Sequence, residues 1–152
     1  MSRLTGKTLN GRLLRKLRGN PSRSGNVILL ATSDKEGWPH IAMLSNWEVF
    51  AKDKTNIRIA TYDSSTTTAN LLRNGRITMT LIDRGMTYYV KGEATLLKKH
   101  AESDAYNSIF GIRVRKVLDD KLTGTIITSG ITFRKKKGVE PHEELHEELT
   151  RC

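Results

Sequence analysis

The sequence has almost no cysteine, and the one residue of this type, Cys152, stands at the last of 152 positions. A single cysteine excludes a disulfide within one chain and a cysteine-based metal site. The chain also lacks any apolar run near the roughly 20 residues that a membrane-spanning helix needs. We therefore expect a soluble protein without a membrane partner, and a reducing, cytoplasmic location is the natural one for it.

Familiar catalytic motifs are missing as well. The sequence has no G-x-S-x-G, no P-loop and no G-x-G-x-x-G, and its four histidines form no nucleophile constellation. The segment "HEELH", residues 142–146, matches the H-E-x-x-H zinc pattern, which needs both histidines on one helix face and a third ligand. No third ligand stands out downstream, so we predict an acidic, solvated helix, no metal site and no dedicated acid or base.

Acidic residues are absent from positions 1–25, although the chain as a whole carries 16 of them and a formal charge of +10. Residues 1–25 are thus a basic arm, a second basic segment lies at 134–137, and an acidic tail covers 139–152. Basic arms bind nucleic acid or anionic ligands, but they are equally often solvated helix faces. An organellar targeting segment also starts this way, yet the arm reads equally well as a first helix. Because residues 1–25 contain no aromatic side chain, nucleic-acid binding by base stacking is not expected.

The hydrophobic pattern predicts a mainly β chain of the α+β class that forms one domain over residues 1–152. Leucines spaced three and four apart predict a helix at 9–19, and alternating or buried apolar runs bounded by turn residues predict strands. Six strands joined by short turns favour a six-stranded antiparallel barrel with flanking helices. The strands are expected at 26–33, 40–50, 57–62, 77–83, 86–97 and 124–136, and further helices at 66–73, 98–121 and 141–149.

Five hydroxyl side chains in a row, Ser64 to Thr68, precede the expected helix at 66–73. A helix start exposes unpaired N–H groups and a positive dipole end, which attract phosphate. One hydroxyl suffices to cap a helix, so five exceed that need. The run is open to three interpretations: a helix cap, a flexible loop or a cradle for an anion.

The order of these segments brings out a resemblance. The stretches "ILLATSDKEGWPHIAMLS", "IRIATYDSSTTTANLLRNGRITMTLI" and "YYVKGEATLL" resemble the flavin-binding split barrel of the pyridoxamine 5'-phosphate oxidase-like family, from about residue 26 to 97. The shared features are the turn with Gly37 and Pro39, the strand end at Thr61, the helix start at Ser65, and the later glycine Gly92. Leu71 and Asn74 also match the spacing of the leucine and asparagine in the family pattern.

The sequence departs from the family pattern at its cations. Thr67 stands where the family has a phosphate-binding lysine, and the arginine and lysine of the second strand are replaced near Ala42 and 45–47. Gly75 stands where proline is usual, and the oxidase's C-terminal substrate segment with its Arg and His is not evident. These losses argue against true pyridoxamine phosphate oxidase activity, and they weaken flavin mononucleotide (FMN) binding or favour a deazaflavin.

The resemblance implies a homodimer with FMN at the interface between two split barrels. The phosphate would lie on Ser65, Thr66 and Thr67, and we infer that Arg73, Arg76 or Lys91 supplies the missing positive charge. The remaining implied cofactor residues are Thr61, Tyr62 and Asn70 at the ribityl and ring region, and Met43, Leu44, Ser45 and Asn46 under the isoalloxazine. Trp47, Tyr88 and Tyr89 are candidates for the ring or substrate wall, with packing in the barrel core as the alternative.

Three functions follow from these observations. The first is an FMN-dependent oxidoreductase that uses a small-molecule electron donor or acceptor, or its deazaflavin-dependent counterpart. The second is a flavin-binding or stress protein without turnover. The third is a nucleic-acid-binding module built on the basic arm, which the lack of aromatics there disfavours.

Overall fold

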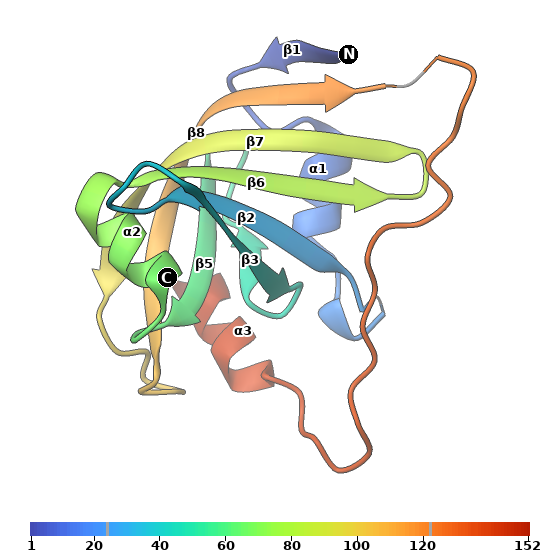
Figure 1. Cartoon of the computed structure of the whole chain (residues 1–152). Helices are drawn as coiled ribbons and strands as arrows, with labels where there is room; N and C mark the ends of the chain where they lie inside the picture. The colour runs from blue at the N-terminus through green and yellow to red at the C-terminus, as the bar shows by residue number, and fades with distance from the viewer. Residues whose placement is uncertain (24, 122) are drawn as a thin grey trace.

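A computed structural model describes residues 1–23, 25–121 and 123–152 of the chain. Most of the elements are strands, and short helices lie at the ends of the sheet (Figure 1). No helix in these ranges has the length and apolar character to span a membrane. The strands are β1 (Ser2–Gly6), β2 (Val27–Ser33), β3 (Pro39–Ser45), β4 (Val49–Ala51), β5 (Asn56–Tyr62), β6 (Arg76–Asp83), β7 (Met86–Lys98) and β8 (Asn107–Asp120); the α-helices are α1 (Gly11–Arg18), α2 (Thr66–Asn74) and α3 (Glu143–Arg151), and a 3-10 turn covers Pro21–Arg23.

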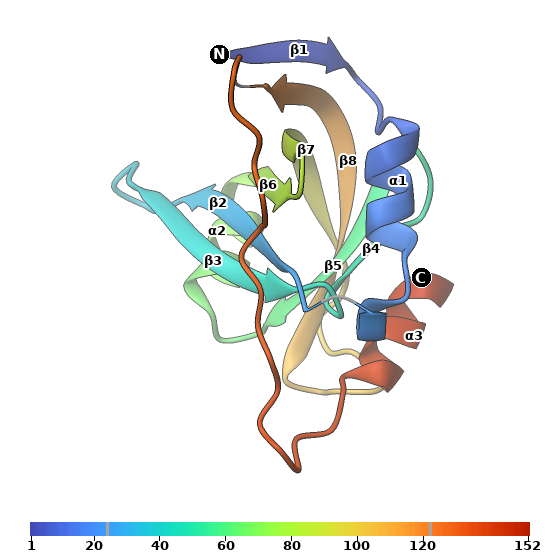
Figure 2. The same cartoon turned by 90° about the vertical axis from the view of Figure 1, so that its right-hand side faces the viewer.

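The strands form one curled antiparallel sheet in the order β3-β2-β6-β7-β8-β5-β4, with β1 added beside β8. Strands β3 and β4 end this path, and the sheet curls without joining them into a closed ring. This arrangement confirms the predicted antiparallel split barrel with flanking helices, although the described residues form eight strands where six were expected. Figure 2 shows the β2–β3 hairpin projecting on one side of the sheet and α1 and α3 on the other.

Alternating side chains build the core. In β2 every second residue is buried, and Leu30 packs in one cluster with Met79 of β6, Val90 of β7 and Ile112 of β8. Helix α1 adds its apolar face to this cluster, as the leucine spacing predicts, and Leu13 is completely buried. Asn10 begins α1 by accepting a hydrogen bond of 2.9 Å from the N–H of Leu13. Because the core lies inside the curl, the outer face of the sheet carries the exposed side chains, which include charged residues such as Lys91 and apolar ones such as Ile41 and Met43.

The second predicted strand, 40–50, is wrong in its length. The chain turns after β3, where the Glu48 carboxylate accepts hydrogen bonds of 2.7 Å from both the N–H and the hydroxyl of Ser45. Strand β4 then pairs with β5 at the opposite end of the sheet path. The local turn chemistry of Ser45 and Glu48 therefore ends the hairpin and carries the chain across the split.

The predicted helix at 98–121 is also wrong, because most of this range is strand β8. Its residues alternate between buried Ile112, Val114 and exposed Arg113, Arg115, which is the period of a strand. The charged and helix-favouring residues before Asn107 masked this period. They form the connection from β7 instead.

The predicted strand at 124–136 is absent as well, and the described part of this segment crosses the start of β2 in extended form. Val27 N–H donates to the carbonyl of Ile131 at 2.9 Å, and Phe133 N–H donates to that of Gly25 at 2.7 Å. Strand β2 is paired with β3 along its length but with β6 at Leu29–Ala31, so the backbone at its start is open to the C-terminal segment. We call residues 123–142 the C-terminal strap; in Figure 2 it runs across the front of the molecule.

Candidate functional site

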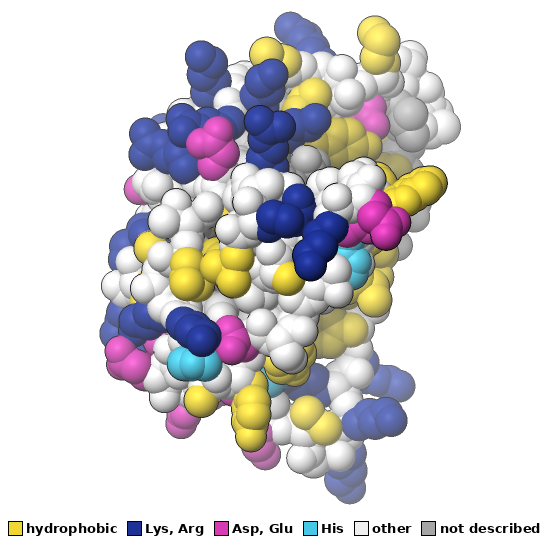
Figure 3. Space-filling model, turned by 60° about the vertical axis from the view of Figure 1, so that its left-hand side comes forward, with side chains coloured by type: hydrophobic (Ala, Val, Ile, Leu, Met, Phe, Trp, Pro, Cys, Tyr) yellow, Lys and Arg dark blue, Asp and Glu magenta, His cyan; other side chains and the backbone are white. Residues whose placement is uncertain are grey.

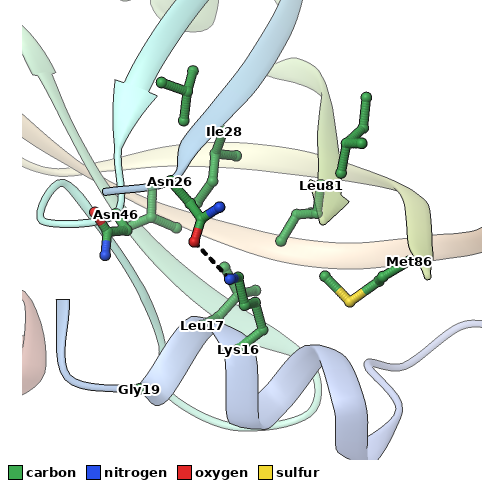
Figure 4. A pocket seen from close by; sticks show the side chains of 11 residues that line it. Lys16, Leu17, Gly19, Asn26, Ile28, Asn46, Leu81 and Met86 are labelled. Carbon is green, nitrogen blue, oxygen red and sulfur yellow. Dashed lines mark hydrogen bonds between the residues drawn. The ribbon is translucent and has the colours of Figure 1, made fainter. Parts of the chain in front are cut away.

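The cavity beneath α1, inside the barrel end, is far too small for a cofactor. It has a volume of about 20 Å³ and lies among Leu17, Ile28 and Leu81 (Figure 4). A volume of this size holds about one water molecule, whereas ligand sites occupy roughly 300–1,000 Å³. At the rim, Lys16 donates a hydrogen bond of 2.7 Å to the side-chain oxygen of Asn26. This cavity is therefore not a cofactor site.

The start of α2 lies directly after β5 and carries the hydroxyl run. Ser65 is the N-cap residue, and its hydroxyl oxygen accepts a hydrogen bond of 3.1 Å from Thr68 N–H. Gly75 ends the helix in the left-handed conformation at φ +67°, which suits a glycine. The cap interpretation thus holds for Ser65, and its contact with a phosphate stays a prediction.

Apart from the cap residue Ser65, the hydroxyl side chains of the run form a buried pair and an exposed pair. Thr68 is buried, and its oxygen lies 2.7 Å from that of Thr61 and donates to the Tyr62 carbonyl at 2.7 Å. Thr67 is also buried, whereas Ser64 and Thr66 are exposed. In the described part of the chain, the N–H groups of Thr66 and Thr67 make no hydrogen bond, as is usual in a first helical turn. An anion at this helix start would meet these two N–H groups and the exposed hydroxyls.

Asn70 is turned away from this helix start. Its side-chain amide is buried and donates a hydrogen bond of 3.0 Å to the Thr32 hydroxyl of β2. Arg73, one turn later, donates to the carbonyl of Ser33. Both side chains therefore fasten the second half of α2 to the β2–β3 hairpin, and the ribityl contact predicted for Asn70 stays untested.

Residues 43–46 lie at the end of β3, an edge of the sheet. Met43 is 69% exposed, while Leu44 belongs to the core. Asn46 donates through its side-chain amide to the Pro21 carbonyl at 2.9 Å, and its N–H donates to the Asn26 carbonyl at 3.1 Å. Of the predicted ring-side residues, Met43 and Ser45 are thus the ones best placed to meet a ligand from outside.

Sequence reasoning missed the C-terminal strap as a wall of this region. Phe133, Lys135 and His142 line a pocket of about 290 Å³ together with Met43 and Ser45. Lys135 Nζ lies 5.4 Å from the centre of the Trp47 ring and donates to the carbonyl of Glu140 at 2.9 Å. The basic run 134–137 was the only signal in the sequence, and it carried no information about which strand it would meet. The pocket gives the ring-side region a cation that the second strand itself lacks.

The candidates for an aromatic wall are mostly structural. Trp47 is 8% and Tyr88 6% exposed, and the Trp47 carbonyl accepts a hydrogen bond from His146 at 2.9 Å. Tyr89 donates to Asp120 at 2.7 Å, which together with its burial raises the pKa of the phenol. His146 also packs edge-on against the Trp47 ring. Packing is therefore what the structure shows for Trp47 and Tyr88.

The histidines of the "HEELH" segment belong to different surroundings. His146 is bonded to Trp47, whereas His142 precedes the helix and lies in the pocket of Met43. Across the described ranges, no group of three or more His, Cys, Asp or Glu side chains is arranged to hold a metal ion.

A second hollow, which we call the outer groove, lies between the tip of the β2–β3 hairpin and the outer face of β6, β7 and β8. It has a volume of about 600 Å³. Arg76 and Lys91, two of the cations inferred to serve a cofactor phosphate, line this groove. Arg76 follows the C-terminal end of α2, and the hydroxyls precede the other end, about 13 Å away along a nine-residue helix. The structure therefore places Arg76 at the end of α2 that lies away from the hydroxyl run, and the role inferred for Arg73, Arg76 or Lys91 stays a prediction.

Comparisons with known proteins agree with this fold. The profile of a family described as pyridoxamine 5'-phosphate oxidase matches residues 22–127. The uncharacterized protein YclD of Bacillus subtilis (strain 168) is 34% identical over 108 residues, which are 71% of this chain and 70% of that protein.

Two solved structures share the fold. A candidate pyridoxamine 5'-phosphate oxidase from Lactobacillus delbrueckii superposes with a TM-score of 0.60 at 14% identity, over 77% of this chain and 98% of that one. An FMN-binding protein from Syntrophomonas wolfei gives a TM-score of 0.55 at 19% identity, over 73% and 88% of the two chains. At these identities the likeness concerns the fold alone.

Proposed function

Because the chain belongs to the pyridoxamine 5'-phosphate oxidase family, as the match over residues 22–127 shows, we propose that it binds FMN and acts as an oxidoreductase on a small molecule. Flavin binding is a property found among its relatives, one of which is an FMN-binding protein. We propose further that residues 1–152 form one flavin-binding domain. The substrate and the electron donor are not specified by this proposal.

The observation that carries the proposal is the start of α2. The N–H groups of Thr66 and Thr67, which bond to no other described residue, lie beside the exposed hydroxyls of Ser64 and Thr66. Helix starts of this composition favour a phosphate through the N–H groups, the hydroxyls and the helix dipole. The residues present therefore fit the anionic end of FMN even without the lysine that the family has at position 67.

The ring of the cofactor would lie along the end of β3. Met43 and Ser45 would face it, and the C-terminal strap would cover it with Phe133 and Lys135. The flavin supplies the electron-transfer chemistry when bound, and the protein binds, orients and tunes it. A cation such as Lys135 near the ring stabilises a negative charge there, which favours the reduced form of a flavin.

We also propose that the protein is a homodimer with the cofactor between its subunits. Trp38, Ile41 and Met43 are 68%, 57% and 69% exposed, and the last two alternate along edge strand β3. Exposed apolar side chains grouped on a strand edge are a usual sign of a partner surface. A second copy covering them would also close the side of the cofactor that faces solvent.

Titration of the purified protein with FMN, followed by flavin absorbance and fluorescence, tests the proposal. We expect the double replacement of Ser64 and Thr66 by Ala to raise the dissociation constant about tenfold, because it removes two hydroxyl donors to a charged phosphate. Thr8→Ala, which removes an exposed hydroxyl from a loop, serves as the matched control. A protein that takes up no FMN, or a double variant that binds as the unchanged protein does, would contradict the phosphate assignment.

The alternative proposal of a deazaflavin rests on the missing cations at 42 and 45–47. The same titration with a deazaflavin in place of FMN separates the two cofactors. If the protein binds FMN but the absorbance of the bound flavin does not fall when a reduced nicotinamide is added, flavin storage is favoured over an oxidoreductase.

A further inference from the structure

The outer groove is strongly cationic. Its lining includes Arg76, Lys91, Arg115 and Lys116 from three adjacent strands, and Glu93 is its one carboxylate. Glu93 is already engaged, since it accepts hydrogen bonds of 3.0 and 2.6 Å from the guanidinium of Arg115. Within the described ranges, the other three cations form no ion pair. Figure 3 shows Lys and Arg side chains gathered on this face of the molecule.

Two of these cations stand directly against each other. Lys91 of β7 and Lys116 of β8 are cross-strand partners, and both side chains are exposed on the outer face. Like charges placed opposite each other destabilise an antiparallel pair. A local arrangement that lowers stability without an internal compensation is expected where a ligand supplies the compensation. An anion in the groove would do so.

The hairpin tip that borders the groove is held by hydrogen bonds to Asp34. The carboxylate of Asp34 accepts hydrogen bonds of 2.9 Å from Glu36 N–H and 2.8 Å from Trp38 N–H. These bonds hold the hairpin tip, whose Gly37 and Pro39 line the groove. These bonds favour one conformation of the tip, which lowers the entropy cost of binding a ligand beside it.

The size of the groove identifies the class of ligand. A volume of about 600 Å³ exceeds what a single inorganic phosphate fills and lies within the range of small-molecule sites. Its lining also includes the small side chains of Ala31 and Thr78. A nucleic-acid strand would instead follow a longer basic track with stacking aromatics.

We propose that the outer groove binds the phosphate groups of a nucleotide-sized ligand, with Arg76, Lys91 and Lys116 as its cations. This site goes beyond the proposed flavin function and is separate from the α2 start and the β3 end. Its test needs no flavin, so failure of FMN binding leaves the groove untouched.

Isothermal titration of the purified protein with ADP at low salt measures the site, and adenosine is the matched probe without phosphate. We expect ADP to bind and adenosine not to bind. Lys91→Gln and Lys116→Gln should each raise the dissociation constant about fivefold, because each removes one charged contact to phosphate. Lys99→Gln, which removes an exposed lysine just beyond the far end of β7, should leave the constant unchanged.

Thermal unfolding gives a second readout that a merely structural role would not produce. Without ligand, Lys116→Gln should unfold at a higher temperature than the unchanged protein, since it removes the repulsion from Lys91. With ADP the difference in unfolding temperature between the two proteins should become smaller or change sign. The reason is that only the unchanged protein gains the full stabilisation by the ligand. A variant that is less stable without ligand and equally stabilised by ADP would overturn the proposal.

Two competition experiments complete the test. Displacement of ADP by FMN would show that the groove and the flavin site are one, and it would overturn their separation. A single-stranded oligonucleotide that binds more tightly than ADP, and loses this advantage in Lys91→Gln, would overturn the small-ligand assignment in favour of nucleic acid. Independent binding of ADP and FMN, with a weak oligonucleotide, is the expected outcome.

Discussion

Thr68 is the residue of the hydroxyl run that the fold uses for itself. Its side chain is 1% exposed and bridges the Thr61 hydroxyl and the Tyr62 carbonyl, both at 2.7 Å. The bridge ties the first turn of α2 to the last residues of β5. Ser64 and Thr66, by contrast, are exposed and available to a ligand.

Replacement of Thr68 by Val should therefore lower stability. The change keeps the shape of the side chain but leaves the buried Thr61 hydroxyl and the Tyr62 carbonyl without this partner. We expect the free energy of unfolding to fall by about 1–3 kcal/mol, measured by urea denaturation. Thr68→Ser, which retains the hydroxyl, should recover the bonded part of this loss. A larger loss in Thr68→Ser than in Thr68→Val would show that the methyl group and not the bridge is what matters.

At the scale of elements, a buried carboxylate joins α3 to the sheet in addition to the packing of Leu145 and Leu149. Glu148 is 1% exposed and accepts hydrogen bonds from Lys98 at 2.9 Å, from the hydroxyl of Ser103 at 2.7 Å and from the N–H groups of Glu102 and Ser103 at 3.0 and 2.9 Å. Burial alone would raise the pKa of Glu148, but these hydrogen bonds together lower it to about 2. The helix is thereby joined to the connection between β7 and β8.

This carboxylate makes stability depend on pH in a defined window. Because the folded pKa is below the ordinary value of 4.5, the contribution is complete above that value and is lost as the pH falls toward 2. Glu148→Gln should lower the free energy of unfolding by about 2 kcal/mol at pH 7, and the difference from the unchanged protein should shrink between pH 4.5 and 2.

Denaturation of both proteins at several pH values measures this difference. Glu147→Gln is the matched control. Glu147 is 71% exposed, and its ion pair with Arg151 is long, at 3.9 Å, so it contributes little to stability. Its difference from the unchanged protein should stay near zero at every pH. A pH-independent gap for Glu148→Gln would contradict the role of the ionised carboxylate.

At the scale of the whole molecule, edge strand β3 is the surface on which the proposed dimer depends. Its outward residues Ile41 and Met43 are exposed and apolar, and Met43 also lines the pocket under the C-terminal strap. If this edge is the dimer interface, cofactor binding and assembly depend on the same side chains. Each should then fail when the other does.

Met43→Lys should shift the protein from dimer to monomer in light scattering and weaken FMN uptake at least tenfold, because it places a charge in an apolar contact. Ile41→Lys should break the dimer as well, although Ile41 is not a lining residue of the pocket. Ile126→Lys is the control, since Ile126 is 78% exposed and lies on the strap. A monomeric unchanged protein that binds FMN would refute the shared interface.

Local patterns predicted the elements whose stabilising contacts lie near in sequence. The leucines of α1, the cap residues Ser65 and Gly75, and the β6–β7 hairpin around Arg84-Gly85 all behave as their spacing indicates. The sequence did not predict strand β8, because the polar residues before Asn107 favour a helix. Its alternation becomes clear only from its pairing with β5 and β7. The sequence did not predict the path of the C-terminal strap, because its extended form depends on hydrogen bonds to the start of β2.

The sequence by itself determined the family, the antiparallel class and the helix start that would hold a phosphate, because period, caps and turn residues are local properties. Tertiary structure alone decided which hydroxyls are buried, as with Thr67 and Thr68, and which cations share a surface. Lys91 and Lys116 are 25 positions apart, and only the register of β7 on β8 sets them opposite each other. Register is set by the packing of the whole sheet, so no local pattern in the chain announces it.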